Sequence, residues 1–278
     1  MKILIIGASS YVGARIYFDL KDKYDVVGTY NSNPLSSSFI KLDITSKGDT
    51  DRILKELRPE IVIHVANYPS PRSAVGNEDN FIKLNDMGTV NVVNSANEIG
   101  AKVVFISSQA ANNANNIYGK LKAKSEELVK KTKAGYLIIR PSLMIGFSPN
   151  TTNPRPFNRI LKCLDATTIG EFDTTWKLQP TYVGHLSQII DKAIGNSIWN
   201  RSIPVFIDEL VTQYQIAQDL LGEFGIKVAK VDQHINIPPS KDDTSLFKSF
   251  NLPPYTYAEM INLIVREIKE RGKFKLDI

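Results

Sequence analysis

Short runs of apolar residues alternate with stretches of helical periodicity through the first half of the chain. The apolar runs are continuous and rich in β-branched residues, which is typical of strands buried on both faces of a parallel sheet. They cover residues 2–6, 25–30, 39–43, 60–65, 102–107 and 136–140. Helical patterns fill the gaps at 12–20, 49–57, 81–99 and 118–131. This order predicts a doubly wound parallel α/β sheet.

The pattern loosens after Pro141. The stretch 148–156 holds three prolines and two threonines, which indicates a loop crossing to another module. Two later helical patterns, at 213–224 and 257–271, lie among proline-rich turns. We therefore expect a main domain over 1–147, followed by a smaller C-terminal α/β lobe on the substrate side.

Composition narrows the class of protein. With 42% hydrophobic and 23% charged residues among 278, the chain is an ordinary globular protein. Its net charge of +5 comes from scattered Lys and Arg, so we expect no nucleic-acid partner, and a small anionic ligand suits the balance. No apolar run approaches the ~18 residues of a membrane helix, and the first run meets a glycine turn instead of a cleavage site. Together with the single cysteine, Cys163, this predicts a cytoplasmic protein without internal disulfides.

The first apolar run ends in a glycine turn with the sequence Gly7-Ala-Ser-Ser-Tyr-Val-Gly13. In a Rossmann domain the first glycine makes the turn, the last allows close helix packing, and the helix N-terminus binds a pyrophosphate. Ser10 occupies the place of the middle glycine, and its small hydroxyl could donate to a phosphate. A purely structural turn is the alternative. The expected cofactor contacts are Gly7, Ser9, Ser10, Tyr11, Val12 and Gly13.

The end of the second strand bears on the type of cofactor. A carboxylate there would bind the ribose of NAD and repel the extra phosphate of NADP. The chain has Tyr30, Asn31 and Ser32 at this point, with no acid, and Arg15 is a candidate cation on the first helix. This favours NADP, with NAD as the alternative cofactor. An Asn/Ser turn without a ligand is also consistent with these residues.

A tyrosine and a lysine, Tyr118 and Lys122, lie four residues apart and so share one face of a helix. A lysine cation lowers the pKa of a nearby phenol, which makes the pair suitable for proton transfer. Upstream, Ser108 follows a strand at the carboxyl edge of the sheet, where it could bond the substrate oxygen. The alternative for the pair alone is a surface helix with an exposed lysine.

With these motifs the chain resembles the extended short-chain dehydrogenase/reductase superfamily, and within it the dTDP-4-dehydrorhamnose reductase family. The resemblance covers almost the whole chain. It includes Leu42-Asp43-Ile44, His64-Val-Ala-Asn67, Asn85-Asp-Met-Gly-Thr89, Arg140-Pro-Ser-Leu-Met-Ile-Gly146 and Gln179-Pro-Thr-Tyr-Val-Gly-His-Leu186. The last of these resembles the segment that returns to the main domain, so 176–197 is assigned to that domain and the smaller lobe to 148–175 and 198–278.

The resemblance implies an enzyme that transfers a hydride from NADP(H) to a keto group of a nucleotide-linked sugar. Tyr118 would be the proton donor, Lys122 its electrostatic partner, and Ser108 would replace the family's catalytic Ser or Thr. A homodimer is compatible with it. Further cofactor contacts would be Asp43, Ile44, Val65, Ala66, Asn67, Asn85, Tyr118, Lys122, Arg140, Pro141 and Ser142. Substrate contacts would be Ser108, Gln109, Arg155 and Trp176.

The sequence also departs from the family. Only nine residues separate Ser108 from Tyr118, so the usual substrate loop is missing, and 238–246 lacks the family's arginine. Gln109 and Ala110 replace the Asp-Glu pair of dehydratases, which excludes dehydration. Two other functions stay open: an epimerase that retains NAD, and a non-catalytic regulatory subunit that binds a cofactor.

Other polar residues have simpler interpretations. Arg155, Arg159 and Lys162 have a helical spacing that could point two of them at a diphosphate, or they are solvated. His64 in its apolar strand is interpreted as a packed histidine. His185 and His234 lack neighbouring ligands, so no metal site is predicted.

Overall fold

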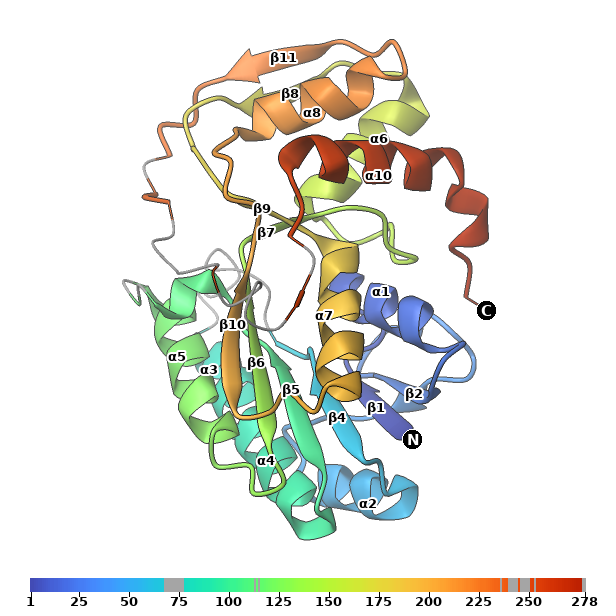
Figure 1. The fold of residues 1–278 in the computed structure, drawn as a ribbon, viewed down its shortest axis with the longest axis vertical. Coiled ribbons are helices and arrows are strands. Elements are labelled where there is room, and N and C mark those ends of the chain that lie inside the picture. The colour runs from blue at the N-terminus through green and yellow to red at the C-terminus, as the bar shows by residue number, and fades with distance from the viewer. Residues whose placement is uncertain are drawn as a thin grey trace.

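The computed structural model describes residues 1–67, 78–112, 114, 116–235, 237–239, 245, 251–252 and 254–276. Figure 1 shows a large layered domain, with the parallel strands at its centre, and a smaller lobe above it. Both chain halves contribute to the larger domain, because the segment after residue 180 returns to it.

The centre of the large domain is a seven-stranded sheet in the order β10-β6-β5-β4-β1-β2-β3, with every neighbouring pair parallel. Its strands are β1 (Lys2–Ile6), β2 (Asp25–Tyr30), β3 (Ile40–Lys41), β4 (Ile61–His64), β5 (Lys102–Ile106), β6 (Tyr136–Pro141) and β10 (Arg201–Val205). The chain order reverses between β1 and β4, which is the doubly wound topology. The predicted fold class is confirmed.

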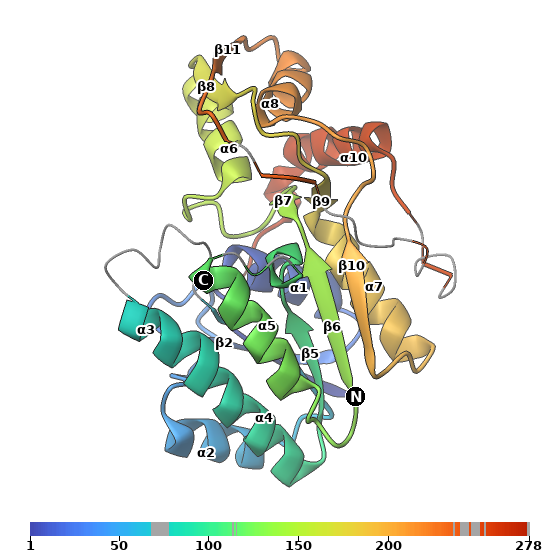
Figure 2. The same cartoon turned by 90° about the vertical axis from the view of Figure 1, so that its left-hand side faces the viewer.

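Helices cover both faces of the sheet. The helices α1 (Tyr11–Leu20) and α7 (Val183–Gly195) lie on one face, and α2 (Lys47–Leu57), α4 (Gly88–Ile99) and α5 (Ile117–Val129) lie on the other (Figure 2). Along β1, Ile3 and Ile5 belong to the first hydrophobic cluster, whereas Leu4 and Ile6 belong to the second. Successive side chains of a strand point to opposite faces, so a continuous apolar run serves two cores.

The strand β10 departs from the expected domain boundary. The sequence analysis placed residues after 197 in the smaller lobe, but β10 pairs with β6 at the edge of the main sheet, with Ser202 opposite Ile138. Pro204 lies within this strand, and a proline in a strand is tolerated at an edge. The boundary at 198 is therefore wrong, and the returning segment extends through Val205.

The smaller lobe combines helices with short strands. It contains α6 (Pro156–Ala166), α8 (Gln213–Gly222), α10 (Tyr257–Lys269) and the parallel pair β8 (Gly170–Asp173) and β11 (Val228–Val231). A second parallel pair, β7 (Leu143–Ile145) and β9 (Pro180–Tyr182), lies between the two parts of the fold (Figure 1). The sequence analysis predicted α8 and α10 but assigned no helix to α6 or α7.

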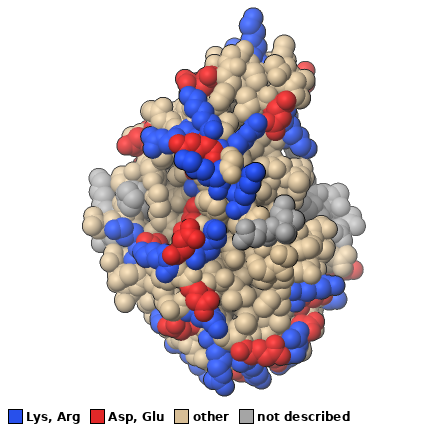
Figure 3. Space-filling view, turned by 90° about the vertical axis from the view of Figure 1, so that its right-hand side faces the viewer, with Lys and Arg blue, Asp and Glu red and all other residues tan. Residues whose placement is uncertain are grey.

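The charged side chains are mixed on the face seen in Figure 3, where basic and acidic groups lie next to one another over both lobes. Several are paired, as in the contacts of Lys55 with Glu98 and of Arg271 with Asp165. Within the described part of the chain, no helix combines the length and the apolarity needed to span a membrane.

Candidate active site

The carboxyl ends of β1, β4, β5 and β6 meet at one edge of the sheet. The glycine turn follows β1, Val65–Asn67 follows β4, Ser108 follows β5 and Ser142 follows β6. Because parallel strands end at the same edge, most of the residues predicted for cofactor and substrate come together there.

The glycine turn leaves no room for side chains at its two ends. Gly7 has φ +88°, and a Cβ there would lie 2.9 Å from the backbone nitrogen of Ala66. A Cβ on Gly13 would lie 2.1 Å from the carbonyl oxygen of Gly7. Ser10 caps α1, since its Oγ accepts the Gly13 N–H at 3.0 Å. Its hydroxyl hydrogen is not used in that bond and can donate to an anion.

The segment after β7 covers the same turn from the other side. The Asn150 side chain donates to the Ser9 carbonyl at 2.6 Å, and Ser148 donates to the Tyr11 carbonyl at 2.6 Å. The Tyr11 hydroxyl is buried and donates to the carbonyl of Gly146. The Tyr11 side chain therefore holds the 146–150 segment, a role that the sequence analysis did not assign to it.

The end of β2 places Asn31 and Ser32 in an exposed turn after the half-buried Tyr30. Arg15, the cation suggested for a ribose phosphate, is 5% exposed and points elsewhere. Its guanidinium pairs with Asp19 at 2.8 Å and with Glu267 of α10 at 2.7 Å. The prediction that Arg15 lies near the ribose phosphate is therefore wrong, because its ion pairs connect α1 to the C-terminal helix α10.

Several residues expected to contact the cofactor are largely engaged in local structure. Asp43 accepts bonds from the amide and the hydroxyl of Thr45, at 2.9 and 2.8 Å, and Ile44 is buried against Gly88. Val65 is buried, and its carbonyl accepts the side chain of the half-buried Asn67 at 2.9 Å. These groups line the same sheet edge, beside the glycine turn.

Ser108, which follows β5, lies beside Tyr118 of α5, and its side chain opposes the rise in the pKa of that phenol. The Lys122 ammonium donates to the carbonyl of Ile106 at 2.8 Å. Lys122 is 1% exposed and lies 4.5 Å from the centre of the Phe105 ring. Burial lowers the pKa of Lys122 to about 7, opposed by the nearby carboxylate of Glu126.

The electrostatics of Tyr118 differ from the expectation. Burial raises the pKa of Tyr118, and the groups that oppose the rise are the Ser108 hydrogen bond and the charge of Arg155. The sequence analysis gave that role to Lys122. The Lys122 ammonium is instead directed at the backbone of β5 and at an aromatic ring, which moves its charge away from the phenol.

Arg155, which was predicted to contact the substrate, lies near Tyr118. It precedes α6 and interacts electrostatically with Tyr118 and Tyr11, while burial lowers its pKa. Trp176 follows β8, and its amide donates to Asp173 at 2.8 Å while its ring packs on the core. Gln109 begins the short helix after Ser108, and its Oε1 is buried without a hydrogen-bond partner among the described residues.

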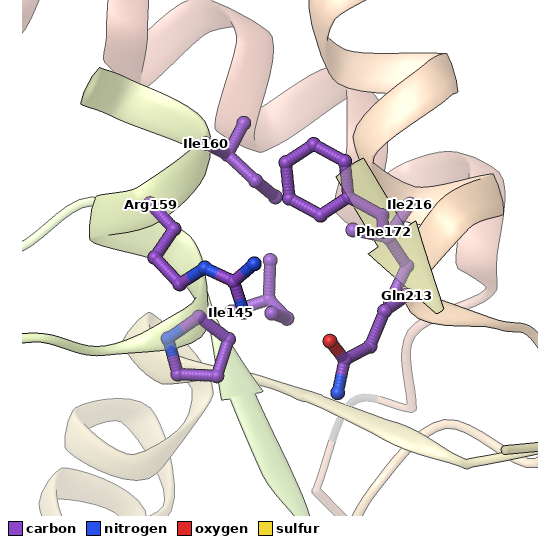
Figure 4. Close-up of a pocket in the computed structure, with 7 residues that line it drawn as sticks. Ile145, Arg159, Ile160, Phe172, Gln213 and Ile216 are labelled. Carbon is purple, nitrogen blue, oxygen red and sulfur yellow. The ribbon is translucent and has the colours of Figure 1, made fainter. Parts of the chain in front are cut away.

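Arg159 does not join this group. It lies 5.7 Å over the Phe172 ring and donates to the Glu171 carbonyl at 3.3 Å. Figure 4 shows Arg159 and Gln213 at a small pocket of the smaller lobe. Its lining is otherwise apolar and consists of Ile145, Pro156, Ile160, Phe172 and Ile216. Of the segment 238–246, only 238–239 and 245 are among the described residues, so the expectation for that segment falls mostly outside them.

Asn85 lies in a π-helical turn, Lys83–Met87, that follows α3 (Glu78–Ile82) and leads into α4. Its side chain donates to the Phe81 carbonyl at 2.8 Å, and its own carbonyl accepts the hydroxyls of Thr89 and Ser125. Asn85 therefore links the π turn to α5, the helix that carries Tyr118 and Lys122.

Sequence reasoning missed Glu126, which follows Lys122 by four residues on the same helix face. Its carboxylate accepts the Ser107 hydroxyl at 2.6 Å and the guanidinium of Arg140 at 2.9 Å. Arg140 was expected to contact a cofactor, and the structure gives it this buried ion pair. Next to it, the Ser142 amide donates to Thr181 at 2.9 Å, and Pro141 is buried. The helical spacing from Lys122 was the available signal for Glu126.

His64 is packed in the core, as interpreted from the sequence. Thr89 gives its hydroxyl hydrogen to the Asn85 carbonyl at 2.7 Å, so we assign His64 Nε2 as the donor to Thr89, at 3.2 Å. Burial, together with the charge of Lys122, lowers the pKa of His64 to about 3. The ring is therefore neutral near neutral pH.

This pKa predicts a pH-dependent stability. Between about pH 6.5 and pH 3 the unfolded chain binds a proton that folded His64 does not, so the free energy of unfolding falls as pH drops. From about pH 7 to 5, the stability advantage of the wild type over His64→Gln should shrink by roughly 2 kcal/mol in urea denaturation. Parallel curves for wild type and His64→Gln would contradict the assignment.

The sheet topology, the glycine turn and the Ser108, Tyr118 and Lys122 cluster define a dinucleotide-binding α/β protein of the dehydrogenase type. Residues 3–191 match the NAD dependent epimerase/dehydratase family. This chain belongs to that family.

Individual relatives are distant. The methionine adenosyltransferase 2 subunit beta of Bos taurus is 23% identical over 159 residues, which cover 52% of this chain. That match covers 47% of the bovine protein, so the chain spans about half the length of this relative.

Two solved structures share the fold along nearly the whole chain. The dTDP-4-dehydrorhamnose reductase from Bacillus anthracis in complex with NADP superposes with a TM-score of 0.81 at 21% identity, covering 97% of this chain and 99% of that one. The UDP-glucose 4-epimerase of Thermotoga maritima with UDP-glucose has a TM-score of 0.81 at 17% identity, covering 98% and 100%.

Proposed function

We propose that this protein is an NADP(H)-dependent reductase that transfers a hydride to a keto group of a nucleotide-linked sugar. The observation that carries the proposal is the placement of Ser108 next to Tyr118, with Lys122 one helical turn away, at the edge where the glycine turn lies. The likeness to a dTDP-4-dehydrorhamnose reductase solved with NADP supports the choice of substrate and cofactor.

The residues of the turn fit a dinucleotide. Gly7 and Gly13 form a cradle that any Cβ would fill, and the Ser10 hydroxyl hydrogen points from the N-terminus of α1, where an anion is stabilised. Asp43, Ile44, Val65, Ala66 and Asn67 would line the adenine side, while Asn31 and Ser32 would face a ribose phosphate. When bound, the nicotinamide supplies or accepts the hydride.

Side chains of the protein itself would transfer the proton. Tyr118 donates its phenolic proton to the substrate oxygen as negative charge develops there, and Ser108 hydrogen-bonds the same region. The Lys122 ammonium, which donates to the Ile106 carbonyl, would also hold the neighbouring ribose hydroxyls. Gln109 Oε1, which lacks a partner among the described residues, would accept a substrate hydroxyl, and Arg155 would bind an anionic substrate group.

Calorimetric titration of the purified protein tests the cofactor. We expect NADPH to bind at least about tenfold more tightly than NADH, because no carboxylate lies at the end of β2. Asn31→Asp should weaken NADPH binding by about the same factor, since its carboxylate would repel the ribose phosphate. Asn33→Asp, two residues along the same exposed turn, is the matched control. Failure of both nucleotides to bind would overturn the reductase proposal.

The two similarities also support other candidates. The epimerase fold match supports an enzyme that keeps NAD bound and returns the hydride to its substrate. The match to a methionine adenosyltransferase subunit supports a non-catalytic regulatory role. NAD retained through purification would favour the epimerase, and a stable complex with a partner enzyme without turnover would favour the regulatory subunit.

A further inference from the structure

Three consecutive residues at the end of β5 each interact with a different residue of α5. The carbonyl of Ile106 accepts from Lys122 at 2.8 Å, and the Ser107 hydroxyl donates to Glu126 at 2.6 Å. The third residue, Ser108, lies beside Tyr118 and opposes the rise in the pKa of that phenol. The central contact, to Glu126, is thus flanked by the two contacts that hold the proton-transfer groups.

Glu126 also fixes the next strand. It is 2% exposed, and Arg140 of β6 donates to both of its carboxylate oxygens. The amide of Ser107 donates to the carbonyl of Ile139, the residue before Arg140. One carboxylate therefore joins the ends of β5 and β6 to α5 through charge-assisted bonds, which are stronger than neutral ones.

We propose that Glu126 is a positioning residue of this site: its carboxylate sets the end of β5 against α5 and places a negative charge one helical turn from Lys122. The proposal rests on the roles proposed for Tyr118 and Lys122. Glu126 is buried, and we assign it no contact with substrate or cofactor. It acts through the two contacts that flank Ser107 and through its negative charge, one helical turn from Lys122.

The charges around Lys122 explain why this carboxylate matters. On its own helix Lys122 lies one turn from both Tyr118 and Glu126, and it interacts electrostatically with Glu126. From other elements it interacts with His64 of β4 and with Arg155 before α6. Arg140 lies behind Glu126 on β6. Of these groups, Glu126 favours the protonated lysine, whereas burial and Arg155 oppose it. Without Glu126, Lys122 would lose its proton at a lower pH.

Direct titration of Lys122 tests the proposal without any substrate. In protein labelled with lysine carrying ¹³C at Cε, the Lys122 signal is assigned by its loss in Lys122→Arg and followed with pH. The wild-type midpoint is expected near 7. Glu126→Gln keeps the shape of the side chain and removes its charge, so the midpoint should fall by about one pH unit.

A second variant makes the test independent of general damage to the fold. Arg140→Gln removes a positive charge from the same cluster, so the Lys122 midpoint should rise, opposite to the effect of Glu126→Gln. Glu127→Gln, at an exposed neighbour paired with Lys130, should leave it unchanged. An unchanged midpoint in Glu126→Gln, or shifts of the same sign in both variants, would overturn the proposal. NADPH titration of the same proteins reports separately on the proposed function.

Discussion

Tyr118→Phe should lower turnover by roughly 10²–10⁴-fold while leaving the affinity for NADPH nearly unchanged. The phenol is the group assigned to donate a proton to the substrate oxygen, and Ser108 lies beside it. Phenylalanine keeps the ring that packs against Phe81 at 6.4 Å between centres, so the fold should persist. NADPH consumption with dTDP-4-dehydrorhamnose, together with calorimetry for the cofactor, measures both quantities.

Tyr136→Phe is the matched control. Tyr136 begins β6, so it lies at the sheet edge opposite to the end where Ser142 and the active site are found. Its loss of a hydroxyl should change neither turnover nor affinity. Wild-type turnover in Tyr118→Phe would remove the tyrosine from the mechanism, and equal losses in both variants would indicate a general effect on the fold.

The layered sheet could be predicted from the sequence because its strands are buried on both faces. A continuous apolar run such as residues 2–6 is expected only in a central strand whose two faces are both covered. In the structure β1 spans these same residues. β10 escaped prediction because it lies at a sheet edge and contains Pro204, which weakens the local strand signal. Its place depends on tertiary pairing with β6, which no local pattern contains.

The candidate site likewise contains residues that could be predicted from the sequence and residues that could not. Tyr118 and Lys122 are four residues apart on one helix, so their proximity follows from helical geometry, and Ser108 follows a predicted strand. Glu126 shared that helix face, but its bonds to Ser107 and Arg140 join three elements and depend on the packed sheet. Arg15 shows the converse error. Its position near the glycine turn suggested a ligand, whereas two carboxylates, one of them 252 residues away in sequence, hold its side chain.

The glycine turn predicts a large stability effect. Gly13→Val should lower the free energy of unfolding by at least about 3 kcal/mol and abolish NADPH binding, because even its Cβ would lie 2.1 Å from the Gly7 carbonyl oxygen. The nearest atoms are backbone, so α1 must move away from β1 and open the anion-binding cradle. Chemical denaturation gives the first quantity and calorimetry the second.

Gly48→Val provides the comparison, since Gly48 also lies in the first turn of a helix, α2, but has nothing within 4 Å of its hypothetical Cβ. Valine there should change stability by no more than about 0.5 kcal/mol, because glycine is itself a poor helix former. The contrast separates close packing from helix propensity. If Gly13→Val were as stable as Gly48→Val and still bound NADPH, the tight approach of α1 to β1 would not be what forms the cofactor cradle.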